Sequence, residues 1–95
     1  MPFMLLIHEP VGQRAARTPA EGRAVYERMQ RFGAELKSQG LLLAAESLAS
    51  ERKGTRVQVR AGTTQVLDGP FAEAKEMVGG FFLLDCATQA EAVEI

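Results

Sequence analysis

The sequence predicts a single α+β domain, and three observations predict it. Residues 3–7 are five consecutive apolar residues, which is typical of a short buried strand. Between residues 25 and 36, apolar side chains recur at spacings of four, three and four, which is typical of an amphipathic helix. Residues 56–60 alternate strictly between polar and apolar, as in a strand with one polar face.

Size and charge limit the partners of this domain. Its 95 residues, 46% of them hydrophobic, suffice for one core. Because a domain of this size buries only about 60–65% of its chain surface, we expect it to form a homodimer. Eleven basic and twelve acidic residues give a net charge of −1. This charge provides no general attraction to a polyanion, so neither nucleic acid nor an anionic membrane is expected as a partner.

Cysteine and histidine are too rare for most metal sites. Cys86 is the only cysteine, which excludes an intramolecular disulfide and fits a reducing, cytoplasmic location. His8 is the only histidine. We therefore expect no metal site and no cofactor. The N-terminal apolar run is too short for a membrane span and has no basic region before it, so we expect it to be neither a membrane span nor a signal peptide.

The first half of the chain reads as strand, loop and helix. The apolar run ends at His8-Glu9-Pro10, and we expect this strand to be buried on both faces at the centre of its sheet. Residues 11–17 are polar and predict a loop. Thr18-Pro19-Ala20-Glu21 has the pattern of a capping box with proline at the first helical position. The helix should run from about residue 19 to about 39, where Gly40 ends it.

The second half of the chain reads as strand, hairpin, strand and helix. Residues 41–45 with Leu48 predict a strand directly after the glycine stop. Residues 56–60 and 65–67 predict a hairpin turned at 62–64. Residues 77–86 predict the last strong strand, and Thr88-Gln89-Ala90-Glu91 predicts a capping box that opens a second helix.

Without the hairpin, this order is a ferredoxin-like βαββαβ plan whose last strand is absent from the sequence. In this plan we expect the first strand and the 77–86 strand to be parallel neighbours. We also expect residues 1–95 to be one domain that is incomplete at its C-terminal end, because an uncovered sheet edge promotes association.

A turn followed by charged residues is the most specific motif. Asp68-Gly69-Pro70-Phe71 combines an aspartate that bonds its own backbone, a glycine that tolerates positive φ and a proline that fixes φ. This segment resembles the DGPF motif of the YCII-related (DGPF-domain) family of small bacterial proteins. The resemblance implies a dimeric α/β barrel, in which two copies pair through their sheets. It also implies roles for a histidine and an aspartate, here His8 and Asp68.

His8 and Asp68 are the candidate catalytic residues. Under the parallel arrangement, Asp85 would end its strand beside His8 and form a His–carboxylate pair that positions a general base. The alternative is a strand-end histidine that only hydrogen-bonds a carbonyl. Asp68 either faces a ligand or caps the amides of Phe71 or Ala72.

Four further residues are candidate ligand contacts. Glu73 and Lys75 follow the turn, Glu46 interrupts an apolar strand, and Tyr26 lies beside the helix stripe. Two of them have a structural alternative: an exposed strand end for Glu46, and a boundary residue with a hydrated hydroxyl for Tyr26. The expected function is small-molecule binding, or cofactor-free lyase or hydrolase chemistry on a small organic acid, with Lys75 as anion partner. The resemblance also suggests an alternative, a non-catalytic accessory module associated with sigma-factor regulation.

Overall fold

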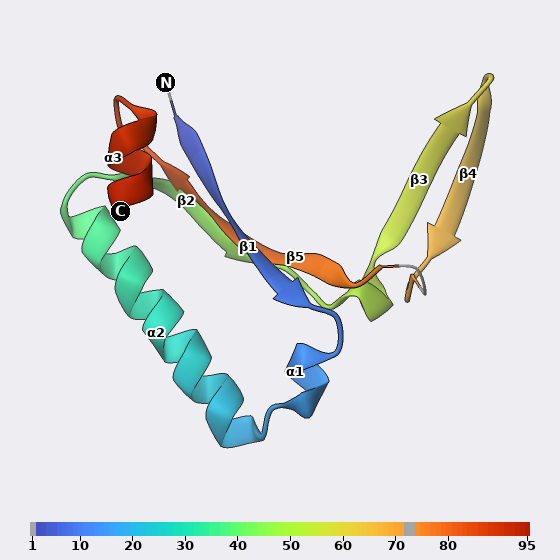
Figure 1. The fold of residues 1–95 in the computed structure, drawn as a ribbon, viewed down its shortest axis with the longest axis horizontal. Coiled ribbons are helices and arrows are strands. Elements are labelled where there is room, and N and C mark those ends of the chain that lie inside the picture. The colour runs from blue at the N-terminus through green and yellow to red at the C-terminus, as the bar shows by residue number, and fades with distance from the viewer. Residues whose placement is uncertain (1, 72–73) are drawn as a thin grey trace.

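A three-stranded sheet with helices on one face and a separate hairpin make up the structure (Figure 1). The computed structural model describes residues 2–71 and 74–95. Its elements in chain order are β1 (Phe3–Pro10), α1 (Gln13–Ala16), α2 (Pro19–Ser38), β2 (Leu42–Ser47), the 3-10 turn η1 (Glu51–Lys53), β3 (Thr55–Arg60), β4 (Thr63–Asp68), β5 (Glu76–Leu84) and α3 (Gln89–Glu94).

The sheet has the order β1-β5-β2, and β5 runs antiparallel to both neighbours. The prediction that the first strand is central and parallel to the last was therefore wrong. The reason is connectivity. The crossover through α2 makes β1 and β2 parallel to each other, and β5 is inserted between them in the opposite direction. The α+β class with a long helix is confirmed.

The helices cover one face of the sheet. Phe82 of β5 meets Phe32 of α2 edge-to-face, with ring centroids 5.1 Å apart and planes at 87°. The buried core consists of Leu36, Phe82, Leu84 and Cys86. Strand β1 contributes to it with every second side chain only, so the expected burial of both faces was also wrong: Met4 and Leu6 are exposed.

Helix α2 begins and ends as its sequence predicts. Thr18 accepts from the Glu21 N–H, and the Glu21 carboxylate accepts from the Thr18 N–H. Gly40 follows the helix at φ 71°, where a side chain would be strained. At α3, Thr88 likewise accepts from Glu91, but the Glu91 carboxylate accepts from Ala87 instead of Thr88, so this capping box is only half formed.

The predicted loop at 11–17 contains one helical turn, α1. A proline-free polar stretch is compatible with either state, and tertiary contacts of Arg14 decide it, as described below. Among the described residues, no helix is long and apolar enough to cross a membrane.

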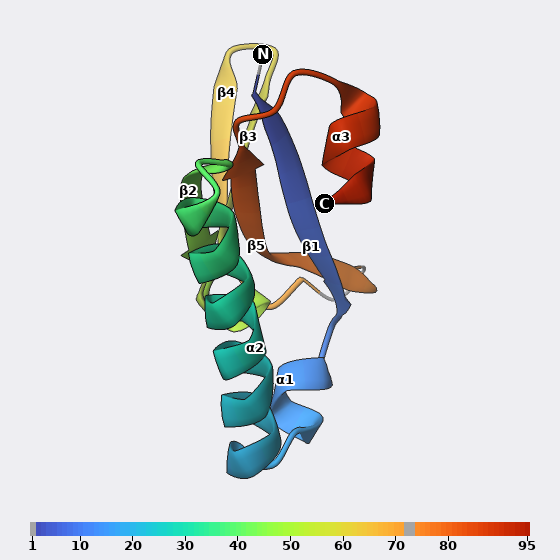
Figure 2. The same cartoon turned by 90° about the vertical axis from the view of Figure 1, so that its left-hand side faces the viewer.

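Strands β3 and β4 form the predicted hairpin, which we call the arm. Its turn is the pair Ala61-Gly62, one residue earlier than expected, because Arg60 pairs directly with Thr63. Both turn residues have positive φ, 49° and 77°, as in a type I′ turn. Figures 1 and 2 show the arm standing apart from the sheet, on the side opposite α2. The chain measures 44 × 38 × 18 Å.

Candidate functional site

The face of the sheet opposite the helices carries the candidate site, and we call it the open face. Residues directly opposite each other in an antiparallel pair share a face. Since Phe82 points at α2, the neighbouring Phe81 and its cross-strand partners Leu6 and Glu46 point the other way. By the same register the open face comprises Met4, Leu6 and His8 of β1, Val78, Phe81 and Leu83 of β5, and Ala44 and Glu46 of β2.

A bulge in β5 sets which side chains accompany His8. The register shifts between Ile7, opposite Gly80, and His8, opposite Val78, so that Gly79 is left unpaired. Because Gly79 takes up the extra position, Val78 lies beside His8 on the open face. Glycine is needed there, since a Cβ on Gly79 would overlap the Glu9 carboxylate.

Two polar side chains, His8 and Glu46, lie on this face. Both are far from the end of β5 that Asp85 follows. They lie on the two edge strands, and Phe81 and Val78 lie between them on β5. From the usual strand spacing and rise, their Cα atoms are about 12 Å apart. At this separation β1 and β2 are not hydrogen-bonded to each other. The distance leaves room for a small ligand between the His8 and Glu46 side chains.

An ion pair on the opposite side of the sheet fixes the bulge. Arg14 Nε donates to Glu9 Oε1 at 2.6 Å, and Glu9 is buried. The same guanidinium donates to the Leu48 carbonyl at 2.6 Å and the Gly79 carbonyl at 3.0 Å. Arg14 thus links α1, the end of β1, the bulge and the residue after β2. Nothing in the local sequence predicted this network, because its partners are 34 and 65 residues away.

Asp68 lies at the base of the arm. Its Oδ1 accepts from the Thr55 hydroxyl at 3.2 Å, and the next residue, Gly69, donates its N–H to the Gly54 carbonyl at 2.8 Å. These bonds close the two strands where the arm leaves the body. The Asp68 side chain is exposed, and the alternative that it caps Ala72 concerns a residue outside the described part of the chain. The Gly69–Pro70 peptide bond is cis, and Gly69 is not among the residues with positive φ.

The segment after the motif leads from the arm into β5. The Lys75 carbonyl accepts from the Val11 N–H at 2.9 Å, which places Lys75 beside the end of β1, and its side chain is exposed. Phe71 lies under the Arg56 guanidinium, 4.4 Å from the ring centroid. Glu73 falls outside the described residues.

Two expected neighbours are separated from His8. Asp85 follows the end of β5 that pairs with Phe3, whereas His8 pairs near the other end, so the predicted His8–Asp85 pair is wrong. The error follows from the antiparallel direction of β5. Tyr26 is 56% exposed on α2, and this helix packs on the opposite face of the sheet. Within one chain the structure does not bring Tyr26 together with His8.

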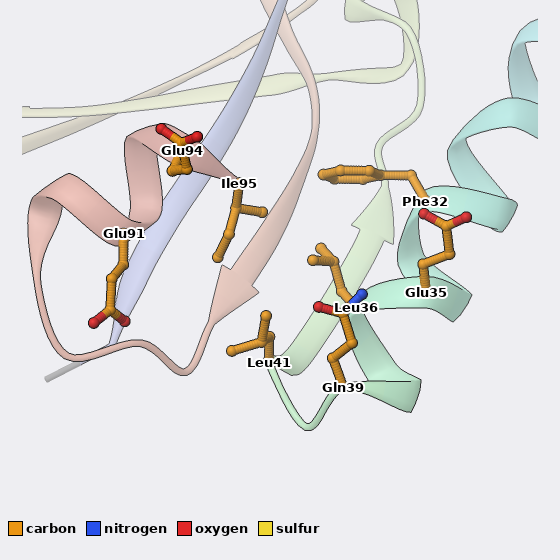
Figure 3. A pocket seen from close by; sticks show the side chains of 8 residues that line it. All are labelled: Phe32, Glu35, Leu36, Gln39, Leu41, Glu91, Glu94 and Ile95. Carbon is orange, nitrogen blue, oxygen red and sulfur yellow. The ribbon is translucent and has the colours of Figure 1, made fainter.

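A hollow lies elsewhere, between the end of α2 and α3 (Figure 3). Its volume is about 440 Å³, and none of the candidate residues lines it. Its lining combines apolar and acidic side chains with one amide: Phe32, Leu36, Leu41 and Ile95, then Glu35, Glu91 and Glu94, and Gln39. In the described part of the chain, no three His, Cys, Asp or Glu residues cluster as metal ligands do.

Comparison with known proteins gives a family and a short local match. The pattern of the YCII-related domain matches residues 1–95. An uncharacterized protein of Rhizobium meliloti (strain 1021) is 59% identical over 34 residues. This segment covers 36% of the chain but only 27% of the relative's length.

Proposed function

The chain belongs to the YCII-related domain family, and we propose that it binds a small organic acid on the open face of its sheet. In this proposal it acts on the acid, or on a ring-cleavage product of similar size, as a cofactor-free lyase or hydrolase. The observation that supports it is the pair His8 and Glu46. They flank Phe81 and Val78 on a face that is otherwise mainly apolar.

The residue types suit the proposed roles. An imidazole has two ring nitrogens that can accept and donate protons, so it can serve as a general base or acid. Asp68, at the base of the arm, is the second acid–base group, and Lys75 supplies a cation for the ligand carboxylate. Apolar side chains between such groups hold the carbon skeleton of a small ligand, as in most small-molecule sites.

We further propose that the functional unit is a homodimer that covers the open face. Met4 and Leu6, which are 55% and 45% exposed, line this face together with the half-buried Phe81 and Leu83. Apolar surface of this kind, gathered on one side of a small domain, usually marks an interaction site. A second copy would also give the ligand an enclosed site in place of an open surface.

The single histidine makes the proposal directly testable. Because His8 is the only histidine, its imidazole proton resonances report on this position without assignment of other histidines. Titration with succinate or cis,cis-muconate should shift these resonances.

A substitution tests the second residue. Asp68→Asn should weaken binding or turnover at least tenfold, since an amide still accepts the Thr55 hydrogen bond but is neither base nor anion. Asp85→Asn, on the far end of the sheet, is the matched control.

Two results would contradict the site. One is the absence of any His8 shift with either acid at millimolar concentration. The other is equal binding by Asp68→Asn and Asp85→Asn. In that case Asp68 would have only the structural role of holding the base of the arm together through Thr55. Binding without turnover would favour the non-catalytic interpretation of the same site.

A further inference from the structure

We propose that the arm is a dimerisation element whose valine face packs against the open sheet face of a second copy of the chain, reciprocally in the two protomers. The inference rests on the proposed homodimer and adds the residues that cover its open face. It assigns a role to strands β3 and β4, which the proposed chemistry leaves unused apart from Asp68.

The arm has an apolar face that its own chain leaves in solvent. Val57 and Val66 form a cross-strand pair, and Val59 follows on the same face. They are 60%, 62% and 67% exposed, respectively. Among the described residues, β3 and β4 make their extensive contacts only with each other. An isolated two-stranded hairpin is at best marginally stable in water, so the arm requires a surface from elsewhere.

The opposite face of the arm differs in chemistry. The register places Arg56, Gln58, Gln65 and Leu67 there. Arg56 on this face stacks on Phe71, so it is the polar face that turns toward the chain's own loop. Strand propensity alone does not explain the valines, because threonine favours strands similarly without adding apolar surface.

The size of the exposed surface fits a second copy. A compact monomer of 10.3 kDa is expected to expose about 5,400 Å². The chain exposes 7238 Å². The excess of about 1,800 Å² per chain corresponds to about 3,600 Å² for two copies, which lies in the range of obligate homodimers. Its Cα radius of gyration, 16.2 Å, likewise exceeds the roughly 12 Å of a compact chain of this length.

The open face is the matching surface. It is apolar at Met4 and Leu6, and the arm stands on the same side of the sheet without covering it (Figure 1). An arm from a second copy would lie over this face near His8 and Glu46. The site would then be completed by the partner, and ligand binding would depend on assembly.

Paired substitutions on the two faces of the arm test the role of the valines. Val57→Thr with Val66→Thr keeps strand propensity and size while removing apolar contact. Gln58→Thr with Gln65→Thr changes the adjacent pair on the polar face. We expect the wild type and the glutamine variant to have twice the 10.3 kDa chain mass by light scattering, and the valine variant to have the single mass. Circular dichroism checks that both variants are folded. A dimer that survives both changes overturns the inference.

Disulfide trapping identifies the opposing surface. A tagged chain with Val66→Cys is mixed with an untagged chain with Leu6→Cys, refolded together and mildly oxidised, and the wild type controls for the buried Cys86. Covalent tagged–untagged dimers support the contact. Crosslinks only between two Leu6→Cys chains would leave the proposed homodimer intact but refute the role of the arm. Crosslinks only between two Val66→Cys chains would refute contact between the arm and the sheet. No crosslink in any mixture would refute both the homodimer and the role of the arm.

Discussion

Phe82 and Val66 both lie on antiparallel strands of the same chain, yet one is buried and the other is 62% exposed. Phe82 belongs to a sheet on which α2 rests, with Phe32 against its ring. Val66 belongs to the arm, where, within the described part of the chain, the only neighbouring strand is β3. The comparison separates two sources of stability. The helix-covered sheet supplies its own apolar contacts, while the valines of the arm are left exposed by the described part of the chain.

The largest expected effect lies in the helix-covered sheet. Leu84 is 1% exposed and sits between the helices and both edge strands. Leu84→Ala should lower the free energy of unfolding by about 2–5 kcal/mol, because it removes buried methyl groups and leaves a cavity. Urea denaturation measures it. Val93→Ala, at a position 79% exposed on α3, is the control and should change stability by less than about 0.5 kcal/mol. Similar losses for both would mean that Leu84 is not part of a packed core.

A smaller loss is expected at the bulge in β5. Arg14→Gln removes the partner of the buried Glu9 and two hydrogen bonds to carbonyls. The free energy of unfolding should fall by about 1–3 kcal/mol. Arg28→Gln on the exposed side of α2 is the matched control, and we expect it to be nearly neutral. An equally small effect of Arg14→Gln would show that the network does not hold the end of β1.

A gain in stability is expected at the tip of the arm. Ala61 has φ 49°, a conformation that costs an alanine free energy and that asparagine tolerates. Ala61→Asn should raise the melting temperature by an amount equivalent to about 0.5–1 kcal/mol. Ala61→Val should lower it, because a β-branched residue suits positive φ least. Equal melting temperatures for the two variants would mean that the arm does not unfold together with the rest of the chain.

The smallest effect concerns pH and the start of α2. The Thr18 backbone N–H, and then its hydroxyl, hydrogen-bond Glu21 and hold the pKa of that carboxyl below its usual range. A lowered pKa adds stability above the unfolded-state value of about 4.3, and this stability is lost as the pH falls through the lowered value. Between pH 5 and pH 3 the wild type should therefore lose slightly more stability than Glu21→Gln. The control variant Glu27→Gln, in the middle of the helix, should lose as much stability over this pH range as the wild type.

Local features of the fold were predictable from the sequence, because their causes lie within a few residues. The helix from Pro19 to Ser38 follows from Thr18, Glu21 and Gly40, which act within one turn. The hairpin follows from strict alternation around a glycine turn. The strand at Glu76–Leu84 follows from its apolar composition.

Features that depend on pairing between distant segments were not predictable. The direction of β5 is decided by the crossover and not by its residues, and it determines that His8 meets Val78 instead of Asp85. The Arg14 network depends on a bulge at Gly79, and a glycine in the sequence allows a bulge but does not predict one. For the site, the sequence singled out His8, Glu46 and Asp68, but it did not indicate that His8 and Glu46 share a face.

The arrangement of layers has a consequence for chemistry: helices cover one face of the sheet, and the described part of the chain leaves the other face open. One layer of helix on one layer of sheet leaves no group on the open face far from bulk water, so charges there act through a high dielectric constant. Water also competes for every hydrogen bond that a substrate could make on such a surface. Enzymes gain much of their rate from fixed dipoles in places that exclude solvent. An open sheet face cannot create such a place alone, so catalysis by this chain would begin with the molecule that adds the third layer.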